Sequence, residues 1–183
     1  HAFQEFVDTY GVPRYKEINP ALFTAVTFPF LFGMMYGDIG HGSCILIGGL
    51  YLLTTFPSYN NSPTSKNEML GGIYASRYMI TMMGACAVYV GFVYNDCFSL
   101  ALTLCESSYW WEDTVGDIAS GTVANSSSYG SARNVYAFGV DPAWHISTNE
   151  LLFFNSMKMK TAVIFGVLQM TGGICLKGLN ALY

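Results

Sequence analysis

Long apolar stretches alternate with short polar segments along this chain. Between residues 18 and 56 the only acidic, basic or histidine side chains are Asp38 and His41, within the glycine-rich sequence Gly37-Asp38-Ile39-Gly40-His41-Gly42. A helix rises about 1.5 Å per residue and a membrane crossing takes roughly 20 apolar residues. This first stretch therefore predicts two crossings joined by a glycine-rich turn. Further crossings are predicted over residues 78–95 and 161–183.

Polar segments separate these predicted crossings. Residues 1–17 are a lead-in that is cytosolic or lies at the membrane surface, and residues 57–77, which begin with a run containing two prolines, are predicted to form a loop. Residues 96–160 hold tryptophans, tyrosines and most of the acids, which is typical of a large extramembrane loop with aromatics at the interface. Within it, Leu151-Leu152-Phe153-Phe154 is apolar but too short to span, so we expect it to lie at the membrane interface.

Composition supports a membrane protein and excludes several functions. Hydrophobic residues make up 52% of the chain and charged residues 11%, whereas soluble domains are about 25% charged. Nucleic-acid binding would need a basic patch, which is missing from a chain of net charge −4. The five cysteines form no framework, although Cys97 and Cys105 are placed to meet outside the lipid, and the dispersed histidines favour no metal site. No cofactor is predicted.

Prolines and glycines indicate where helices begin and how they pack. Asn19-Pro20 predicts the start of the first crossing, and Pro29 should kink it. Gly33 and Gly37 are four residues apart, which is consistent either with close approach of another helix or with chance in a glycine-rich chain. The third crossing has a face of small residues at Gly84, Ala87 and Gly91.

Two pairs of polar residues are candidates for chemistry. Asp38 and His41, three residues apart, would suit a proton relay, but the flanking glycines favour a tight interfacial turn in which polar side chains satisfy backbone groups. Asn95 and Asp96 are consistent with a luminal helix end or, less favourably, with an ion site. Asn125 begins an N-glycosylation sequon, Asn-Ser-Ser.

Basic residues set the expected orientation. A cytosolic N-terminus would place five bases on the cytosolic side and three on the other, as the positive-inside rule prefers. The prediction is an all-α membrane protein with four transmembrane helices, both ends cytosolic, and a large luminal loop between the third and fourth helices. The Asn125 sequon falls in that loop. The five bases are Arg14, Lys16, Lys66, Arg77 and Lys177, and the three are Arg133, Lys158 and Lys160.

A series of motifs in the chain resembles a known family. The motifs are Glu17-Ile18-Asn19-Pro20, Thr27-Phe28-Pro29-Phe30-Leu31-Phe32, the Gly37 to Gly42 sequence, Gly91-Phe92-Val93-Tyr94-Asn95-Asp96 with Phe98-Ser99, and Asn155-Ser156-Met157-Lys158-Met159-Lys160. In this order they are similar to the membrane domain of subunit a of eukaryotic vacuolar-type proton-pumping ATPases. The resemblance covers residues 15–183, apart from the loop of about residues 105–134.

This resemblance implies the stationary membrane subunit of a rotary proton pump. Its expected partners are the proteolipid ring, the other membrane-sector subunits, the remainder of subunit a and the lipid bilayer, in a vacuole, lysosome, endosome or other acidified organelle. The resemblance extends to the first four of the family's eight spans, and the arginine of the family's proton path has no match here. The chain is therefore expected to be a non-catalytic scaffold for the half-channel region.

Other interpretations stay open at this point. The chain begins without methionine and ends within an apolar run, so we expect it to be part of a longer protein. A stand-alone four-span scaffold or adhesion protein is an alternative, and it would predict a disulfide such as Cys97 to Cys105. A transporter in its own right would show an inverted repeat, which we do not find.

Overall fold

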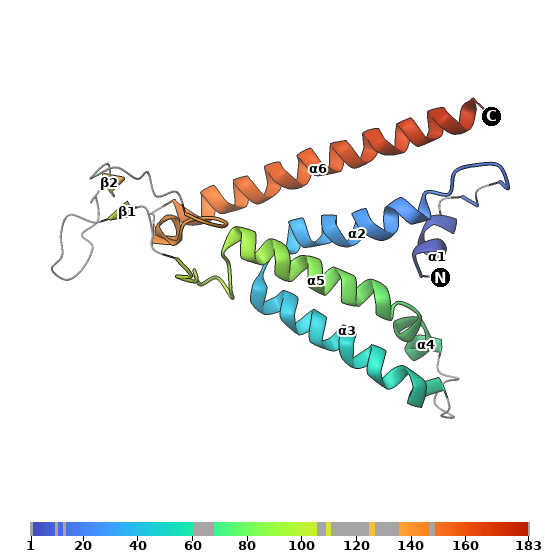
Figure 1. The fold of residues 1–183 in the computed structure, drawn as a ribbon, viewed down its shortest axis with the longest axis horizontal. Coiled ribbons are helices and arrows are strands. Elements are labelled where there is room, and N and C mark those ends of the chain that lie inside the picture. The colour runs from blue at the N-terminus through green and yellow to red at the C-terminus, as the bar shows by residue number, and fades with distance from the viewer. Residues whose placement is uncertain are drawn as a thin grey trace.

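The computed structural model describes residues 2–9, 11–12, 14–60, 68–105, 109–110, 125–126, 136–146 and 149–182. Long helices run side by side along most of the described chain (Figure 1). The helices are α1 (Ala2–Asp8), α2 (Ala21–Tyr36), α3 (Ile39–Asn60), α4 (Glu68–Ala75), α5 (Arg77–Tyr94) and α6 (Glu150–Ala181), with a 3₁₀ helix η2 (Pro142–Ile146). Two two-residue strands, β1 (Tyr109–Trp110) and β2 (Asn125–Ser126), pair antiparallel with Tyr109 opposite Ser126.

Three of these helices, α3, α5 and α6, are long and apolar enough to cross a membrane. Helix α2 is equally apolar but has 16 residues, or about 24 Å of helix, against a hydrocarbon core of about 30 Å. The prediction of a helical membrane protein is therefore confirmed, and three of the described helices are candidate spans. A fourth crossing by α2 and the luminal loop stay predictions.

Helix α2 begins within a residue of the predicted position. The backbone N–H of Ala21 donates to the Asn19 side-chain oxygen at 2.9 Å, which satisfies one of the free amides of the first turn. Pro29 lies inside the helix and is buried. The chain then turns sharply at Gly37 and Asp38 before α3 begins at Ile39.

Glycines bring α5 into direct contact with both helices of the predicted hairpin. A Cβ atom added at Gly84 would lie 2.6 Å from the backbone nitrogen of Leu46, and one at Gly91 would lie 2.5 Å from that of Ile39. On α2, a Cβ at Gly33 would lie 2.8 Å from the backbone of Cys86. Ala87, between the two glycines of α5, is fully buried. The predicted small-residue face of the third crossing is thus a contact surface. The four-residue spacing of Gly33 and Gly37 reflects close packing against α5 rather than chance.

The helices extend beyond two of the predicted boundaries. Helix α3 continues through Pro57 to Asn60, where a loop was expected, and α4 occupies part of the same predicted loop. Aromatic contacts hold these turns together, since the Tyr59 and Tyr74 rings stack with centroids 4.0 Å apart. Residues 61–67 lie outside the described part of the chain.

The second extension is at the start of the last helix. Helix α6 begins at Glu150, before the predicted crossing of residues 161–183, so the apolar segment of residues 151–154 is its first turn. No helix-breaking residue separates this segment from the predicted span, and one continuous helix keeps every backbone bond paired.

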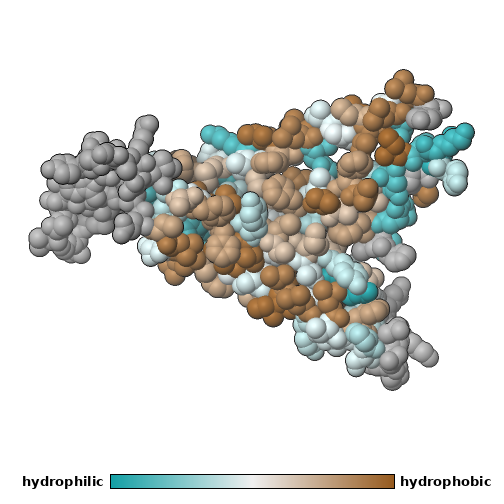
Figure 2. Space-filling view, viewed as in Figure 1, coloured by the Kyte–Doolittle hydropathy of each residue, from teal (hydrophilic) through white to brown (hydrophobic). Residues whose placement is uncertain are grey.

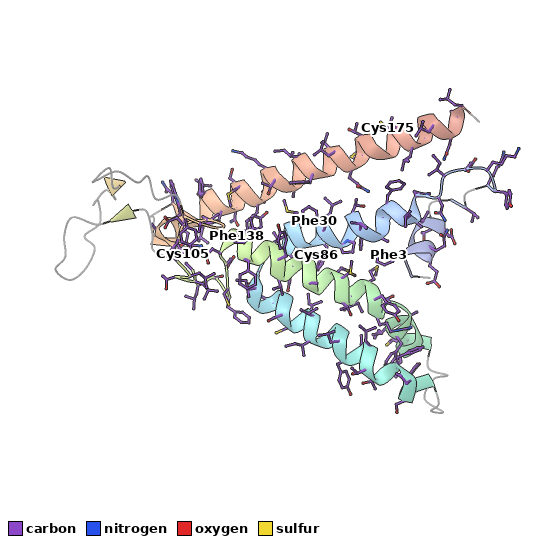
Figure 3. The ribbon with its side chains drawn as sticks, in the orientation of Figure 1. Phe3, Phe30, Cys86, Cys105, Phe138 and Cys175 are labelled. Carbon is purple, nitrogen blue, oxygen red and sulfur yellow. The ribbon has the colours of Figure 1, made fainter. Side chains whose placement is uncertain are left out.

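Helix α6 contacts the other helices far less than α5 does. It diverges from α5 along its length (Figure 1), and its glycines Gly166, Gly172, Gly173 and Gly178 have open space where a side chain would be. A T-shaped contact between Phe30 of α2 and Phe165, with centroids 5.7 Å apart, joins α2 to α6 (Phe30 is labelled in Figure 3). Hydrophobic side chains dominate the visible face over the helices (Figure 2), as a membrane-facing surface requires.

Candidate functional site at the polar helix ends

Asp38 forms the cap of α3 in the turn between α2 and α3. Its Oδ1 atom accepts from the backbone N–H of Gly40 at 2.7 Å and, more weakly, from that of His41 at 3.4 Å. The same oxygen accepts from the N–H of Phe98 at 3.2 Å, which joins the turn to the segment that follows α5. The first-turn amides carry partial positive charge, so a carboxylate here is well placed.

Two opposing effects act on the pKa of Asp38. Burial favours the neutral acid, but hydrogen bonds from His41 and from the backbone N–H groups of Phe98, Gly40 and His41 together favour the carboxylate. The balance lowers the pKa of Asp38 below its ordinary value. The residue is therefore an anion at any pH near or moderately below neutrality.

His41 binds the second oxygen of the same carboxylate. Its Nδ1 lies 2.6 Å from Asp38 Oδ2, and the ring packs edge-on against Phe98 with centroids 4.9 Å apart. Since a carboxylate only accepts, Nδ1 carries the proton of this bond. The His41 side chain is 55% exposed, whereas that of Asp38 is 14% exposed.

Asn95 ends α5 and holds two loop segments against it. The residue is 1% exposed and left-handed at φ 54°, with its N–H directed to the carbonyls of Gly91 and Phe92. Its side-chain amide donates to the carbonyls of Leu102 at 2.9 Å and Val140 at 3.2 Å. Asparagine tolerates the left-handed conformation, so the residue type suits the position. Its Oδ1 atom has no partner among the described residues.

Asp96 connects three helices at this end of the molecule. Its Oδ2 atom pairs with Lys158 Nζ of α6 at 2.9 Å, and its Oδ1 accepts from the N–H of Ser99. Its backbone carbonyl accepts from the N–H of Ile39, the first residue of α3, at 2.9 Å. Two residues earlier, at the end of α5, the Tyr94 hydroxyl lies 3.2 Å from both the Met34 carbonyl oxygen and the Thr161 hydroxyl. These contacts fix α6 to the bundle.

The structure brings four of the five sequence-predicted residues, Asp38, His41, Asn95 and Asp96, to one end of the bundle. Asn125 lies in β2, and its side chain is outside the described part of the chain. The pairing of Lys158 with Asp96 was not predicted from the sequence. Lys158 lies just before an uncharged run, and this position indicates the end of a membrane span, where an acidic side chain could pair with it.

Three of the cysteines lie on different helices, Cys44 on α3, Cys86 on α5 and Cys175 on α6, and Cys97 and Cys105 both follow the end of α5 (Cys86, Cys105 and Cys175 are labelled in Figure 3). All five cysteines are free thiols, including Cys97 and Cys105. The structure therefore gives no support to the Cys97 to Cys105 disulfide that a stand-alone adhesion protein would predict.

These features define a class: a helical membrane protein whose apolar helices pack through glycines and are joined at one end by polar contacts. Comparison with known proteins then gives the family, because the sequence model of the V-type ATPase 116kDa subunit family matches residues 1–183. The chain belongs to this family.

Individual relatives agree along the whole chain. It is 41% identical over 181 residues to the vacuolar proton translocating ATPase 100 kDa subunit of Dictyostelium discoideum, covering 99% of this chain and 21% of that protein. It is 40% identical over 194 residues to the V-type proton ATPase 116 kDa subunit a 1 of Mus musculus, covering 100% of this chain and 23% of that protein. Subunit a 4 of Homo sapiens is 39% identical over 191 residues, with 99% and 23% covered. The chain thus spans about a fifth of the length of these relatives. The stand-alone scaffold alternative finds no support among them.

Proposed function

We propose that this chain is a scaffold region of the stationary membrane subunit of a rotary V-type ATPase, supporting ATP-driven proton translocation without being catalytic itself. The observation that carries the proposal is family membership over residues 1–183, combined with the positions of the charged groups. In α2, α3 and α5 the only acidic, basic or histidine side chains are His41 and Arg77, both in first turns. A proton path across a bilayer needs such groups at mid-membrane.

The proposed partners follow from this role. They are the remainder of the same subunit, the proteolipid ring, other membrane-sector subunits and lipid, in the membrane of an acidified organelle. The names of the relatives support a place in a proton-translocating ATPase.

For the polar helix ends we propose a structural role. Asp38 caps α3, His41 holds the capping carboxylate, and Asn95 with Asp96 ends α5 and fixes the segments beyond it. The hydrogen bonds of Asp38 to three backbone N–H groups support a turn rather than a relay. We also propose that this end is luminal and that Asn125 is a glycosylation acceptor, in keeping with the base distribution.

The topology is tested by cysteine labelling in the full-length subunit with its native cysteines replaced. Met69 of α4 and Leu100 beyond α5 are 83% and 70% exposed and lie at opposite ends of α5. A membrane-impermeant reagent applied to sealed organelles should label a cysteine at position 69 and spare one at position 100. Labelling of both from the same face would refute the proposed topology.

The scaffold role is tested by reconstituting residues 1–183 in liposomes with a pH gradient and an internal pH dye. The gradient should decay no faster than in protein-free liposomes. Faster decay that Asp38→Asn abolishes would show that the polar helix end is part of a proton path.

A further inference from the structure

One basic side chain lies at the end of the helix bundle opposite to Asp96. Arg77 is the first residue of α5, and both the C-terminal end of α3 and helix α4 lie beside it (Figure 1). Helix α5 has 18 residues, about 27 Å, and ends at Tyr94. The hydrocarbon core of a membrane is about 30 Å thick, so a crossing by α5 places Arg77 at the edge of that core, level with the lipid headgroups.

Aromatic rings and a backbone carbonyl fix the position of the Arg77 guanidinium group. Its Cζ atom lies 3.7 Å from the centroid of the Phe56 ring on α3 and 4.6 Å from that of Tyr78 on α5. Its Nη1 atom donates to the carbonyl oxygen of Tyr74 on α4 at 2.9 Å. The Tyr74 ring stacks in turn on Tyr59 of α3. The guanidinium group is therefore held by contacts with all three helices before any ligand binds.

The positive charge of Arg77 has no acidic partner in the described part of the chain. The three ion pairs found there do not include it. Between residues 39 and 95 the sequence holds one acid, Glu68, which begins α4 at the end of that helix away from Arg77. A guanidinium group has about five N–H donors, and the bond to Tyr74 uses one of them. The others have no protein partner among the described residues.

These observations indicate the chemistry of a ligand. A planar guanidinium group with neighbouring unused donors suits the paired oxygens of a phosphate group. Phospholipids supply phosphate at the depth of Arg77. Tyr78, which flanks the guanidinium group, is 58% exposed, as is typical of the aromatic belt at a membrane interface. A headgroup with net negative charge is favoured over phosphatidylcholine, because the choline cation of the latter is repelled by the guanidinium group.

We propose that Arg77 and the aromatic rings around it bind the phosphate group of an anionic phospholipid in the cytosolic leaflet. This inference goes beyond the proposed scaffold role. The choice of leaflet rests on the proposed topology, whereas the binding of an anionic headgroup rests on the contacts and the unpaired charge of Arg77. An acidic side chain of another subunit is the competing ligand, and the exposed tyrosine beside Arg77 favours lipid.

The test is photo-cross-linking of lipid to the full-length subunit in the purified, assembled complex. The complex is reconstituted in phosphatidylcholine nanodiscs with a trace of phosphatidylserine that carries a photoreactive group near its headgroup, or with the matching phosphatidylcholine probe. We expect the phosphatidylserine probe to label the segments around Arg77 at least about fivefold more than the phosphatidylcholine probe does. Both leaflets of a nanodisc have the same composition, so this result does not depend on the orientation of the subunit.

Substitutions then assign the preference to the guanidinium group. Arg77→Gln should reduce labelling by the phosphatidylserine probe to the level of the phosphatidylcholine probe. Arg14→Gln is the control, because it removes an exposed base from the segment before α2 and should leave the labelling around Arg77 unchanged. The amount of assembled complex is measured for each variant. If Arg77→Gln prevents assembly, the comparison of the two probes in the native complex decides alone.

Several outcomes would overturn the lipid proposal. One is equal labelling by the two probes in the native complex, and another is a preference for phosphatidylserine that persists in Arg77→Gln. Absence of lipid adducts around Arg77 would indicate that an acidic side chain of another subunit occupies the site. Displacement of the phosphatidylserine probe by an excess of inorganic phosphate would assign the site to a soluble phosphate instead. ATP-driven pumping and cysteine labelling are separate readouts, so failure here leaves the proposed scaffold role and topology to be judged independently.

Discussion

Helices α5 and α6 are both apolar and both contain several glycines, yet they use them differently. The glycines of α5 at positions 84 and 91 lie against the backbone of α3, whereas those of α6 face open space. Lipid tails are as apolar as leucine, so burial of apolar surface does not drive helices together within a membrane. Close contact between helix backbones does drive association. Helix α5 makes such contact at its glycines, whereas α6 has none at its own. Polar contacts at the helix ends and the contact of Phe30 with Phe165 hold α6 instead.

Enlarging a glycine should have the largest effect and should distinguish the two helices. Gly84→Leu places a side chain where the Leu46 backbone lies within 2.7 Å, so α3 and α5 must separate. We expect a loss of about 3 kcal/mol or more in the free energy of unfolding. The measurement is denaturant unfolding of the detergent-solubilised protein, followed by the amount of folded subunit in membranes.

Gly172→Leu on α6 is the matched control for that substitution. Position 172 has nothing within 4 Å of an added Cβ, so the same change should leave the free energy of unfolding nearly unaltered. Equal losses from the two variants would show that α5 and α6 do not differ in the way the glycine contacts indicate.

The second effect concerns the ion pair that fixes α6 to α5. The side chains of Lys158 and Asp96 are 25% and 16% exposed, so this ion pair is intermediate between a surface pair and a buried pair. Lys158→Met leaves the Asp96 carboxylate without its cation, and we expect a loss of about 1 to 3 kcal/mol in the free energy of unfolding.

Lys160 provides the control, because it is exposed and lies two residues further along the same helix. Lys160→Met removes the same charge and should change the free energy of unfolding by less than about 0.5 kcal/mol. If both substitutions had the same effect, the general charge of this segment, and not the pair with Asp96, would be what holds α6.

The third effect is the cap of α3. Asp38→Ala removes the acceptor for the first-turn amides and should cost about 1 kcal/mol, whereas Asp38→Asn keeps an acceptor and should cost less. Proton transport by the assembled pump should survive Asp38→Asn. Loss of pumping with normal assembly would favour the relay over the turn.

The pH dependence of this cap follows from the lowered pKa of Asp38. A depressed pKa in the folded state gives stabilisation that is present above the ordinary value of 3.8 and is lost as the pH falls through the folded value. The difference in unfolding free energy between the native protein and Asp38→Ala should therefore be constant from pH 7 to 5 and shrink below about pH 4. A difference that already shrinks between pH 7 and 5 would assign the effect to another group.

Much of the fold was predictable because the sequence signals are local. Apolar runs indicated the helices, Asn19 and Pro20 indicated the start of α2, and the spacing of Gly84, Ala87 and Gly91 indicated a packing face. The helix boundaries at Asn60 and Glu150 were not predictable from local signals. Pro57 is a helix breaker by propensity, but the stacking of Tyr59 on Tyr74 keeps the last turn in place.

The candidate site likewise has one part that local sequence signals predict and another that they do not. The Asp38 and His41 pair was predictable from a spacing of three residues. The contact between Asp96 and Lys158 joins residues 62 positions apart, and the bonds of Asn95 to Val140 join residues 45 apart. A single sequence carries no local pattern for such contacts, because they depend on how the chain returns to the end of α5.

The smallest expected effect is at the opposite end of α6. There the Asn180 side-chain oxygen accepts from the backbone N–H of Ile18 at 2.9 Å, at an exposed site. Asn180→Ala should cost about 0.5 to 1 kcal/mol locally and should speed amide hydrogen exchange at Ile18 by up to about fivefold. Leu182→Ala, at a position 84% exposed on the same end of the chain, is the control and should leave that exchange rate unchanged. If Asn180→Ala destabilised the protein more than Lys158→Met, α6 would be held chiefly at this end, and the assignment of its attachment to Asp96 and Tyr94 would be wrong.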